Sequence, residues 1–352
     1  MKVLLAVSGG IDSMYMLHRA PELFPGASFT VAHCNFRLRG AESDGDEALV
    51  REQCSRLGIE CLVKGFDTLE YASSHGISVE MAARELRYGW FRQLCAEHGF
   101  DFLATAHNAN DNAETLILNL LRGTGTKGLR GIPSGCTAPD ILPETSASLH
   151  PSHASVGPSR SHGHGRPWFP EEYPASVPPE GLQVIRPLLG ISREEIRMWM
   201  ESRGLKWRED STNKENEARR NKIRNQVFPV FKEINPSFIK TLGEDIGRIR
   251  QVDDIADDYF RQAAVKIVKN KDNTLEISVL PLLELKHWRY VLWRILEDCA
   301  FSSETFGKLC ALLERYRTAP LGTVTLSGKT FQSPTCTLKC RRKLLVLTKR
   351  EL

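Results

Sequence analysis

The chain has 352 residues, of which 41% are hydrophobic and 26% charged, and its formal net charge is +4. This composition is typical of a soluble globular protein, and the length predicts two or three domains rather than one small core. No apolar run approaches the ~18 residues of a membrane span, and the opening run 3–7 is too short for a signal peptide, so we expect a cytoplasmic protein.

Strand-like and helix-like segments alternate through the first 130 residues. We predict strands at 2–7, 29–34, 59–65 and 101–106, and helices near 12–24, 42–57, 79–98 and 110–122. This alternation favours an α/β fold, a Rossmann-like parallel sheet with helices on both faces. Ligands of such sheets bind beyond the carboxyl ends of the strands. The segments 8–13 and 105–115, which follow the first and fourth predicted strands, should both lie at that edge.

The segment 134–181 has a different composition. It holds nine of the 18 prolines and four of the ten histidines, so it predicts a mobile low-complexity insertion. Order returns with a strand pattern at 182–189, which we expect to close the sheet, and with a helix start at Ser192 that has the residues of a capping box.

The pattern becomes largely helical from about residue 218. Amphipathic stretches lie around 222–233, 237–268 and 281–298, and short strand patterns follow at 323–326 and 344–347. We therefore expect an α/β domain at 1–215, a helical domain at 216–318 and a partial C-terminal β element at 319–352.

The most informative motif is Ser-Gly-Gly-Ile-Asp-Ser at residues 8–13, directly after the first strand. Two glycines let the main chain approach an anion closely, and the helix that follows directs its positive end at the same point. Hydroxyls of Ser8 and Ser13 add donors, and Asp12 supplies a carboxylate suited to Mg²⁺ beside phosphates. The alternative is an ordinary turn capped by Ser8 or Asp12.

Two further pairs of charged residues are spaced to share one face of a helix. Asp111 and Glu114 are three residues apart and are placed to hold Mg²⁺ or a substrate ammonium, unless they serve as ordinary acidic capping. Arg84 and Arg87 are suited to a polyphosphate or a leaving pyrophosphate, unless they belong to a solvated helix laced with Glu/Arg pairs.

Basic residues are concentrated in a few places. His33 lies at the end of the second predicted strand, and Arg37 and Arg39 follow it. All three can contact nucleotide or nucleic acid, although a structural role for His33 is an alternative. A second cluster favours salt-sensitive phosphate contacts, with a solvated helix face as the alternative. It comprises Arg219, Arg220, Lys222 and Arg224, and a basic run follows at 339–343. The glycine-rich stretch 122–128 is weak evidence for a phosphate loop.

With these motifs in order, the chain resembles the PP-loop ATP pyrophosphatase superfamily and, within it, the tRNA(Ile)-lysidine synthetases. The matching segments are SGGIDS, HCNFRLRG, E-x-A-A-R-E-x-R-Y, AHNANDNAET and LLRGTGTKGLRGI within 1–132, then IRPLL, WREDSTN and RRNKIRNQVFP within 182–235. SGGxDS alone indicates the superfamily, whereas the ordered set selects this member.

The resemblance implies ATP-dependent ligation of L-lysine to C2 of the wobble cytidine of a CAU-anticodon tRNA(Ile). AMP and pyrophosphate are released, and decoding switches from AUG to AUA. The resemblance makes 1–215 the PP-loop ATP-binding catalytic domain and 216–318 a helical domain that binds substrate and tRNA. The implied catalytic residues are Asp12, Arg84, Arg87, Asp111 and Glu114, of which Asp111 and Glu114 hold lysine and Asp12 binds Mg²⁺. The implied ATP contacts are Ser8, Gly9, Gly10, Ile11, Asp12, Ser13 and His33, and the implied tRNA contacts are Arg37, Arg39, Arg219, Arg220, Lys222 and Arg224.

The sequence departs from the family pattern at four places, one of which is the insertion at 134–181, where relatives are shorter. Asn110 replaces the first of two paired acidic residues, and Asn108 stands where many relatives carry a second histidine. We also expect the chain to end before a full C-terminal tRNA-contacting domain. The sequence does not determine the oligomeric state, and a homodimer is compatible with it.

Three rival functions are left open. A tRNA thiolase is disfavoured because the nine cysteines include no C-x-x-C pair and are typical of reduced core thiols. An amide-forming synthetase of the same superfamily needs an ammonia source. A tRNA-binding relative with impaired catalysis is suggested by Asn110.

Overall fold

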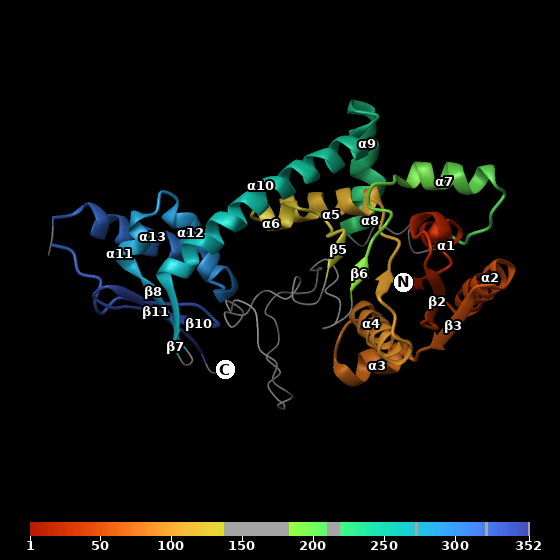
Figure 1. Cartoon of the computed structure of the whole chain (residues 1–352), viewed down its shortest axis with the longest axis horizontal. Coiled ribbons are helices and arrows are strands. Elements are labelled where there is room, and N and C mark those ends of the chain that lie inside the picture. The colour runs from red at the N-terminus through yellow and green to blue at the C-terminus, as the bar shows by residue number, and fades with distance from the viewer. Residues whose placement is uncertain (137–182, 210–218, 272–273, 321–322, 351–352) are drawn as a thin grey trace. The chain divides into compact units, whose positions relative to one another are not determined.

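The structure, a computed structural model, describes residues 1–136, 183–209, 219–271, 274–320 and 323–350. These residues form two compact units, one ending at Gln251 and the other beginning at Val252 (Figure 1). The expected insertion lies outside the described residues except for residues 134–136. None of the described helices is both long enough and apolar enough to cross a membrane.

The first unit is built on a six-stranded sheet in the order β3-β2-β1-β4-β6-β5. Its strands are β1 (Lys2–Ala6), β2 (Ser28–Asn35), β3 (Glu60–Gly65), β4 (Phe102–Ala104), β5 (Gly135–Cys136) and β6 (Val184–Ile185). The first five in spatial order pair in parallel, which confirms the predicted α/β sheet. The prediction that the strand in 182–189 closes the sheet was wrong, because β5 pairs antiparallel beyond β6.

Helices cover both faces of this sheet because side chains alternate along β1. Val3 and Leu5 pack in one core with α1 (Ile11–Leu23), α2 (Ala41–Leu57) and α7 (Arg193–Ser202). Leu4 packs on the opposite face with α4 (Val79–His98), which α3 (Thr68–His75) contacts. The first, second and third predicted helices thus correspond to α1, α2 and α4, whereas α3 was not predicted.

A third layer begins with α5 (Ala109–Arg122), the fourth predicted helix, followed by the short α6 (Thr126–Leu129). Ala113 of α5 shares a small core with Ile223, Phe228 and Phe238. Those residues belong to the π-helical turn η3 (Ile223–Val227), to α9 (Phe228–Ile234) and to α10 (Phe238–Ile267), and η3 directly follows α8 (Arg219–Lys222). Because this core joins them to α5, the helices up to Gln251 belong to the first unit, which differs from the boundary expected at 215.

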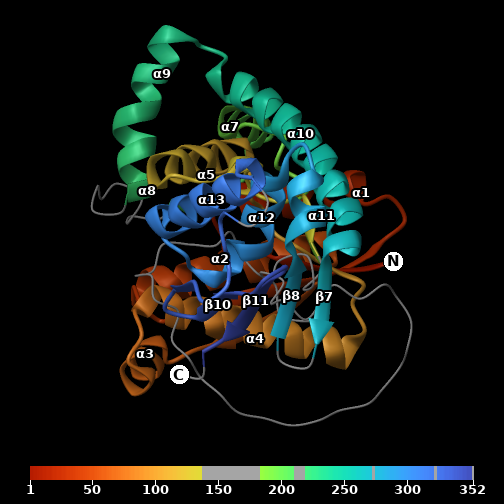
Figure 2. The same ribbon diagram turned by 90° about the vertical axis from the view of Figure 1, so that its left-hand side faces the viewer.

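The second unit contains helices and a five-stranded antiparallel sheet in the order β7-β8-β11-β10-β9 (Figure 2). Its strands are β7 (Val268–Lys271), β8 (Thr274–Ser278), β9 (Thr330–Gln332), β10 (Cys336–Cys340) and β11 (Leu344–Lys349). Its other elements are α11 (Val279–Glu284), α12 (Trp288–Leu296), η4 (Glu297–Cys299) and α13 (Ser303–Thr318).

The C-terminal strands do not form a separate element, because β8 pairs with β11 and one apolar core includes both sheet and helices. The expected strand at 344–347 is confirmed within β11, whereas 323–326 forms no strand. The eight cysteines whose side chains are described are free thiols, as expected.

The start of α7 offers a test of the predicted capping box. Ser192 Oγ accepts a hydrogen bond from the Glu195 N–H, and the Glu195 carboxylate accepts one from the Ser192 N–H. We expect Ser192→Ala to lower the free energy of unfolding by about 1 kcal/mol in urea denaturation. The Glu195 N–H loses its acceptor, and the Glu195 carboxylate loses the hydroxyl donor that helps to hold it. The control Ser55→Ala, at an exposed position inside α2, should change it by no more than a few tenths. Equal effects of the two changes would contradict the capping role.

Candidate active site

The glycine turn, residues 8–10, connects β1 to α1 and is held by its own side chains. Ser13 Oγ accepts a hydrogen bond from the Ser8 N–H at 3.1 Å and donates one to the Gly10 carbonyl at 2.9 Å. Gly9 has a φ of +93°, which favours glycine. Gly10 is the N-cap of α1 and supplies no side-chain cap, so the first N–H groups of this helix point at the turn without an intrahelical partner. Such a turn is suited to binding phosphate.

A pocket of about 320 Å³ opens at the carboxyl ends of β1, β2 and β4. It brings together the two motifs that the sequence placed at this edge, the glycine turn and the start of α5. Its lining residues are Ala6, Val7, Ser8, Gly10, Asp12, Ser13, Ala32, Cys34, Phe36, Arg87, Tyr88, Phe91, Thr105, Ala106, His107 and Asp111. Its size and its mixed lining are those of a small-molecule site.

Three of the expected ATP contacts do not line this pocket. Ile11 is buried in the core, and Gly9 presents its carbonyl to the Arg208 N–H at 3.0 Å. His33 lies on the opposite face of the sheet because Ala32 and Cys34, its neighbours in β2, face the pocket. There His33 Nδ1 lies 2.8 Å from the Val7 carbonyl, and burial lowers the pKa of this imidazole. The structure therefore gives His33 the structural role of supporting the end of β1.

Asn108 connects the start of α5 to Asp12. It caps α5 in a reciprocal box with Asp111, and its Nδ2 donates a hydrogen bond to Asp12 Oδ1 at 2.9 Å. Burial raises the pKa of Asp12, which the Asn108 hydrogen bond and nearby arginines oppose. Asp111 thus both caps its helix and lines the pocket, so the capping alternative holds alongside a role in the site.

Asn110 has a structural partner instead of a place in the pocket. Its Oδ1 accepts a hydrogen bond from the Arg193 N–H at 3.0 Å, which joins α5 to the start of α7. It is absent from the pocket lining, so the amide at this position removes no carboxylate from the pocket.

Glu114 is completely buried and forms a two-point ion pair with Arg224. Arg224 Nε and Nη2 donate to its two oxygens at 2.8 and 3.1 Å, and Nη2 also lies 3.6 Å from Asp111 Oδ1. Burial raises the pKa of Glu114, and the hydrogen bonds and charge of Arg224 oppose that shift. The two carboxylates that were expected to hold an ammonium therefore already share one cation.

The basic cluster expected to bind tRNA is divided by the structure. Arg224 binds Glu114, and Arg220 Nη2 donates a hydrogen bond to Thr115 Oγ1 at 3.2 Å, so both turn toward α5. Arg219 and Lys222 are exposed.

The two arginines after the second strand also differ from one another. Arg39 forms an ion pair with Asp46 at 2.8 Å, whereas Arg37 is exposed, has a φ of +54° and lies against Gly65. Of the expected tRNA contacts, Arg37, Arg219 and Lys222 are the exposed ones.

Arg84 and Arg87 are half-buried on α4, and only Arg87 lines the pocket. Their guanidinium groups lie over aromatic rings, Arg84 over Tyr88 at 5.0 Å and Arg87 over Phe36 at 5.1 Å. Burial lowers the pKa of Arg84. This placement differs from the solvated helix face that was the alternative.

His107 is a pocket residue that the sequence reasoning did not single out. Its Nδ1 lies 3.1 Å from Thr105 Oγ1, and burial lowers its pKa to about 4, with charges from Arg186, Arg220 and Arg87 acting in the same direction and Asp111 opposing them. The imidazole is therefore neutral at pH 7. The sequence offered one signal for His107, which is its position between the end of strand β4 and the capping residue Asn108.

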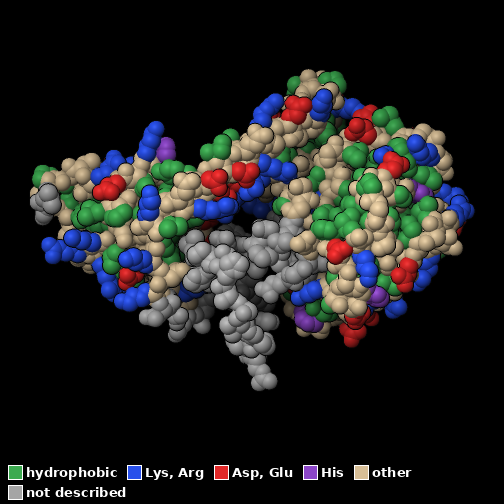
Figure 3. Space-filling view, viewed as in Figure 1, with side chains coloured by type: hydrophobic (Ala, Val, Ile, Leu, Met, Phe, Trp, Pro, Cys, Tyr) green, Lys and Arg blue, Asp and Glu red, His purple; other side chains and the backbone are tan. Residues whose placement is uncertain are grey.

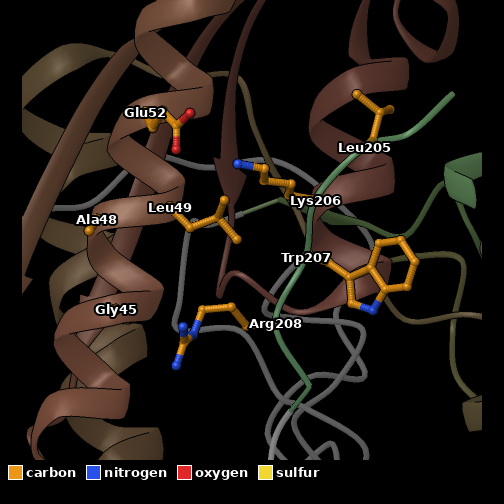
Figure 4. Close-up of a pocket in the computed structure, with 8 residues that line it drawn as sticks. All are labelled: Gly45, Ala48, Leu49, Glu52, Leu205, Lys206, Trp207 and Arg208. Atoms are coloured by element: carbon orange, nitrogen blue, oxygen red, sulfur yellow. The ribbon is translucent and has the colours of Figure 1, made fainter.

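A larger hollow of about 500 Å³ lies between α2 and the segment 205–208 (Figure 4). Lys206 and Arg208 extend from that segment toward α2, and Arg208 Nε donates to Asp46 Oδ1 at 2.6 Å (Figure 4). None of the expected site residues lines it. The smaller pocket is therefore the candidate active site.

The donors available for a metal are few. In the parts of the chain that are described, no group of three or more His, Cys, Asp or Glu side chains is placed to hold an ion. Asp12, with its carboxylate in the pocket, fits Mg²⁺ bound mainly through phosphate oxygens and water.

Comparison with known proteins identifies the family. Residues 1–231 match the PP-loop domain. A tRNA(Ile)-lysidine synthase of Chlorobaculum tepidum is 33% identical over 337 residues, which cover 91% of this chain and 86% of that protein. The chain belongs to the tRNA(Ile)-lysidine synthase family of PP-loop proteins.

Other relatives of this family are longer than the chain. The tRNA(Ile)-lysidine synthases of Porphyromonas gingivalis W83 and Bacteroides thetaiotaomicron are 34% and 36% identical, over 89% and 76% of this chain but only 58% and 52% of their own lengths. Among solved structures, the U34-tRNA thiolase NcsA of Methanococcus maripaludis has a TM-score of 0.50 at 18% identity, covering 71% of this chain and 72% of its own. That likeness supports the fold.

The depressed pKa of His107 predicts acid sensitivity. Since the unfolded imidazole titrates near pH 6.5 and the folded one near 4, the unfolded state binds more protons between these values. His107 therefore contributes stability above pH 6.5 that is lost as the pH falls through 4, up to about 3 kcal/mol. We expect His107→Gln to lose less unfolding free energy than wild type between pH 7 and 4.5 in urea denaturation. Parallel pH profiles would contradict a neutral buried imidazole.

Proposed function

We propose that the chain ligates L-lysine to C2 of the wobble cytidine in a CAU-anticodon tRNA(Ile), with ATP converted to AMP and pyrophosphate and decoding changed from AUG to AUA. The observation that carries this proposal is that a turn suited to phosphate lies close to a pair of carboxylates that already holds a cation. The carboxylates are Asp111 and Glu114, and the cation is the Arg224 guanidinium. A glycine turn alone suits many nucleotide enzymes, whereas the second feature suits an amine substrate. The family supports the same reaction.

In the first step ATP would activate the cytidine by adenylating its C2 oxygen. The N–H groups at the start of α1 and the hydroxyls of Ser8 and Ser13 are placed to bind phosphates. Arg87 stands in the pocket wall, where its charge can stabilise the departing pyrophosphate. Mg²⁺ held by Asp12 would neutralise phosphate charge. Neutral His107 adds no further charge to the pocket.

In the second step the ε-amine of lysine would displace AMP. Free lysine carries an ammonium with a pKa near 10.4, so carboxylates must hold it and it must lose a proton before it attacks. Asp111 faces the pocket, and Glu114 lies behind it bound to Arg224. We infer that the lysine ammonium binds Asp111 and replaces the Arg224 guanidinium on Glu114.

Binding of tRNA would use exposed cations on both units. On the first unit these include Arg37, Arg219 and Lys222. On the second unit, exposed cations lie in and beside strands β9 to β11, where Figure 3 shows Lys and Arg side chains gathered. They are Lys329, Lys339, Arg341, Arg342, Lys343, Lys349 and Arg350. Such contacts are salt-dependent and carry little sequence information.

Thiolation is disfavoured by the cysteine in the pocket. Cys34 lines the pocket, but burial raises its pKa to about 12, so the thiolate that sulfur transfer needs is not populated near pH 7.

The direct test incubates the chain with ATP, Mg²⁺, labelled lysine and a CAU-anticodon tRNA. We expect label in the tRNA, AMP formed in equal amount, and at least a hundredfold loss in Asp12→Ala, because a phosphate-site carboxylate is removed. No incorporation, with AMP formed only when another amine or ammonia is supplied, would show that the substrate is not lysine. Full activity of Asp12→Ala would exclude its assigned role.

The carboxylate pair makes a narrower prediction. Glu114→Gln keeps the shape of the side chain and removes its charge, so we expect the KM for lysine to rise at least tenfold while the KM for ATP stays within threefold. Glu97→Gln, on the exposed face of α4, is the matched control and should change neither. Equal changes in both KM values would place Glu114 in general folding of the pocket rather than in lysine binding.

A further inference from the structure

The segment 130–133, which follows α6, is fixed to the catalytic helix α5. The Ile132 N–H donates a hydrogen bond to Asn112 Oδ1 at 2.7 Å, and Asn112 is the residue after Asp111. Gly131 has a φ of +65°, and a Cβ there would collide with Asn112 Oδ1. Asn119, seven residues along the same face of α5, donates to the Gly128 carbonyl at 2.7 Å. These hydrogen bonds to α5 and the glycine at 131 therefore fix the backbone conformation of the segment.

Arg250 of α10 holds the same segment through two carbonyl groups. Its Nε donates to the Arg130 carbonyl at 2.8 Å, and its Nη2 donates to the Ile132 carbonyl at 2.6 Å. A guanidinium presents two such donors in a fixed geometry, which a lysine cannot reproduce. The helix that carries Arg250 runs from Phe238 to Ile267 and so contributes to both units.

The segment reaches the active site through a second arginine. Arg186, only 3% exposed, donates from Nη1 to the Pro133 carbonyl at 2.9 Å. Its charge acts on His107 in the pocket and on Arg84 of α4. The segment 130–133 thus contacts the side chain that follows Asp111 and the side chain of Arg186. Arg186 directly follows Ile185, whose carbonyl accepts a hydrogen bond from the Thr105 N–H at 3.0 Å, two residues before His107.

We propose that Arg250 is a positioning residue of the active site, which holds the segment 130–133 and through it fixes Arg186 and the first turn of α5. The effect on the ligation rests on the proposed function, whereas the effect on the pocket does not. Arg250 acts through these neighbours and is not among the residues that line the pocket.

The test compares Arg250→Gln with Arg248→Gln in the full chain. Arg248 lies on the same helix, is exposed and pairs with Glu244 and Asp245 of its own helix, so it controls for the loss of a charge from α10. Arg250→Lys keeps the charge and at most one of the two hydrogen bonds. It provides a milder variant should Arg250→Gln fail to fold.

Amide hydrogen exchange gives the readout that needs no lysine chemistry. In Arg250→Gln we expect exchange at least tenfold faster in 130–134 and threefold faster in 105–112, with an intermediate effect in Arg250→Lys and none in Arg248→Gln. Unchanged exchange in 105–112 would overturn the proposal, even if 130–134 became faster, because the segment would then not support the pocket.

Turnover gives the second readout. We expect kcat for lysine incorporation to fall at least tenfold in Arg250→Gln with the KM for ATP within threefold, since the glycine turn itself is unaltered. Wild-type turnover in this variant would overturn the role in the reaction. If wild type incorporates no lysine, the proposed function fails, and the exchange measurements still decide whether Arg250 positions the pocket.

Discussion

The buried ion pair between Glu114 and Arg224 is the interaction on which the active-site region depends. Glu114 has no exposed surface, and a carboxylate buried without a partner is strongly destabilising. Its partner arrives from 110 residues further along the chain, in a π-helical turn between α8 and α9. The pair therefore requires the helices after residue 219 to pack on α5, beside the sheet edge where the glycine turn lies.

This requirement explains why the first unit extends to Gln251. A π-helical turn is an uncommon structure that often marks functional sites. Here it places Arg224 opposite both carboxylates of α5, with Arg220 one turn earlier on Thr115. If a substrate ammonium takes the place of the guanidinium, Arg224 keeps the two carboxylates paired and ordered until lysine arrives.

Local patterns predicted the parallel sheet, four of its flanking helices and the meeting of two motifs at one edge. Apolar runs such as 3–7 and the capping residues of α5 are local signals, so the sequence shows them directly. The side of the sheet that His33 faces depends on strand register. The structure decides it, because Ala32 and Cys34 line the pocket and His33 between them must face the other way. The partner of Arg224 and the pairing of β8 with β11 join distant segments, so no local pattern reveals them. Asn108 looked like a departure from the family, yet its amide both caps α5 and binds Asp12.

The most direct test of the carboxylate pair is a structure of the chain with L-lysine and a non-hydrolysable ATP analogue bound. The proposed mechanism predicts triphosphate at the glycine turn, the lysine ammonium within hydrogen-bond distance of both Asp111 and Glu114, and the Arg224 guanidinium displaced from Glu114. Lysine bound elsewhere, with the Arg224 to Glu114 hydrogen bonds intact, would contradict it.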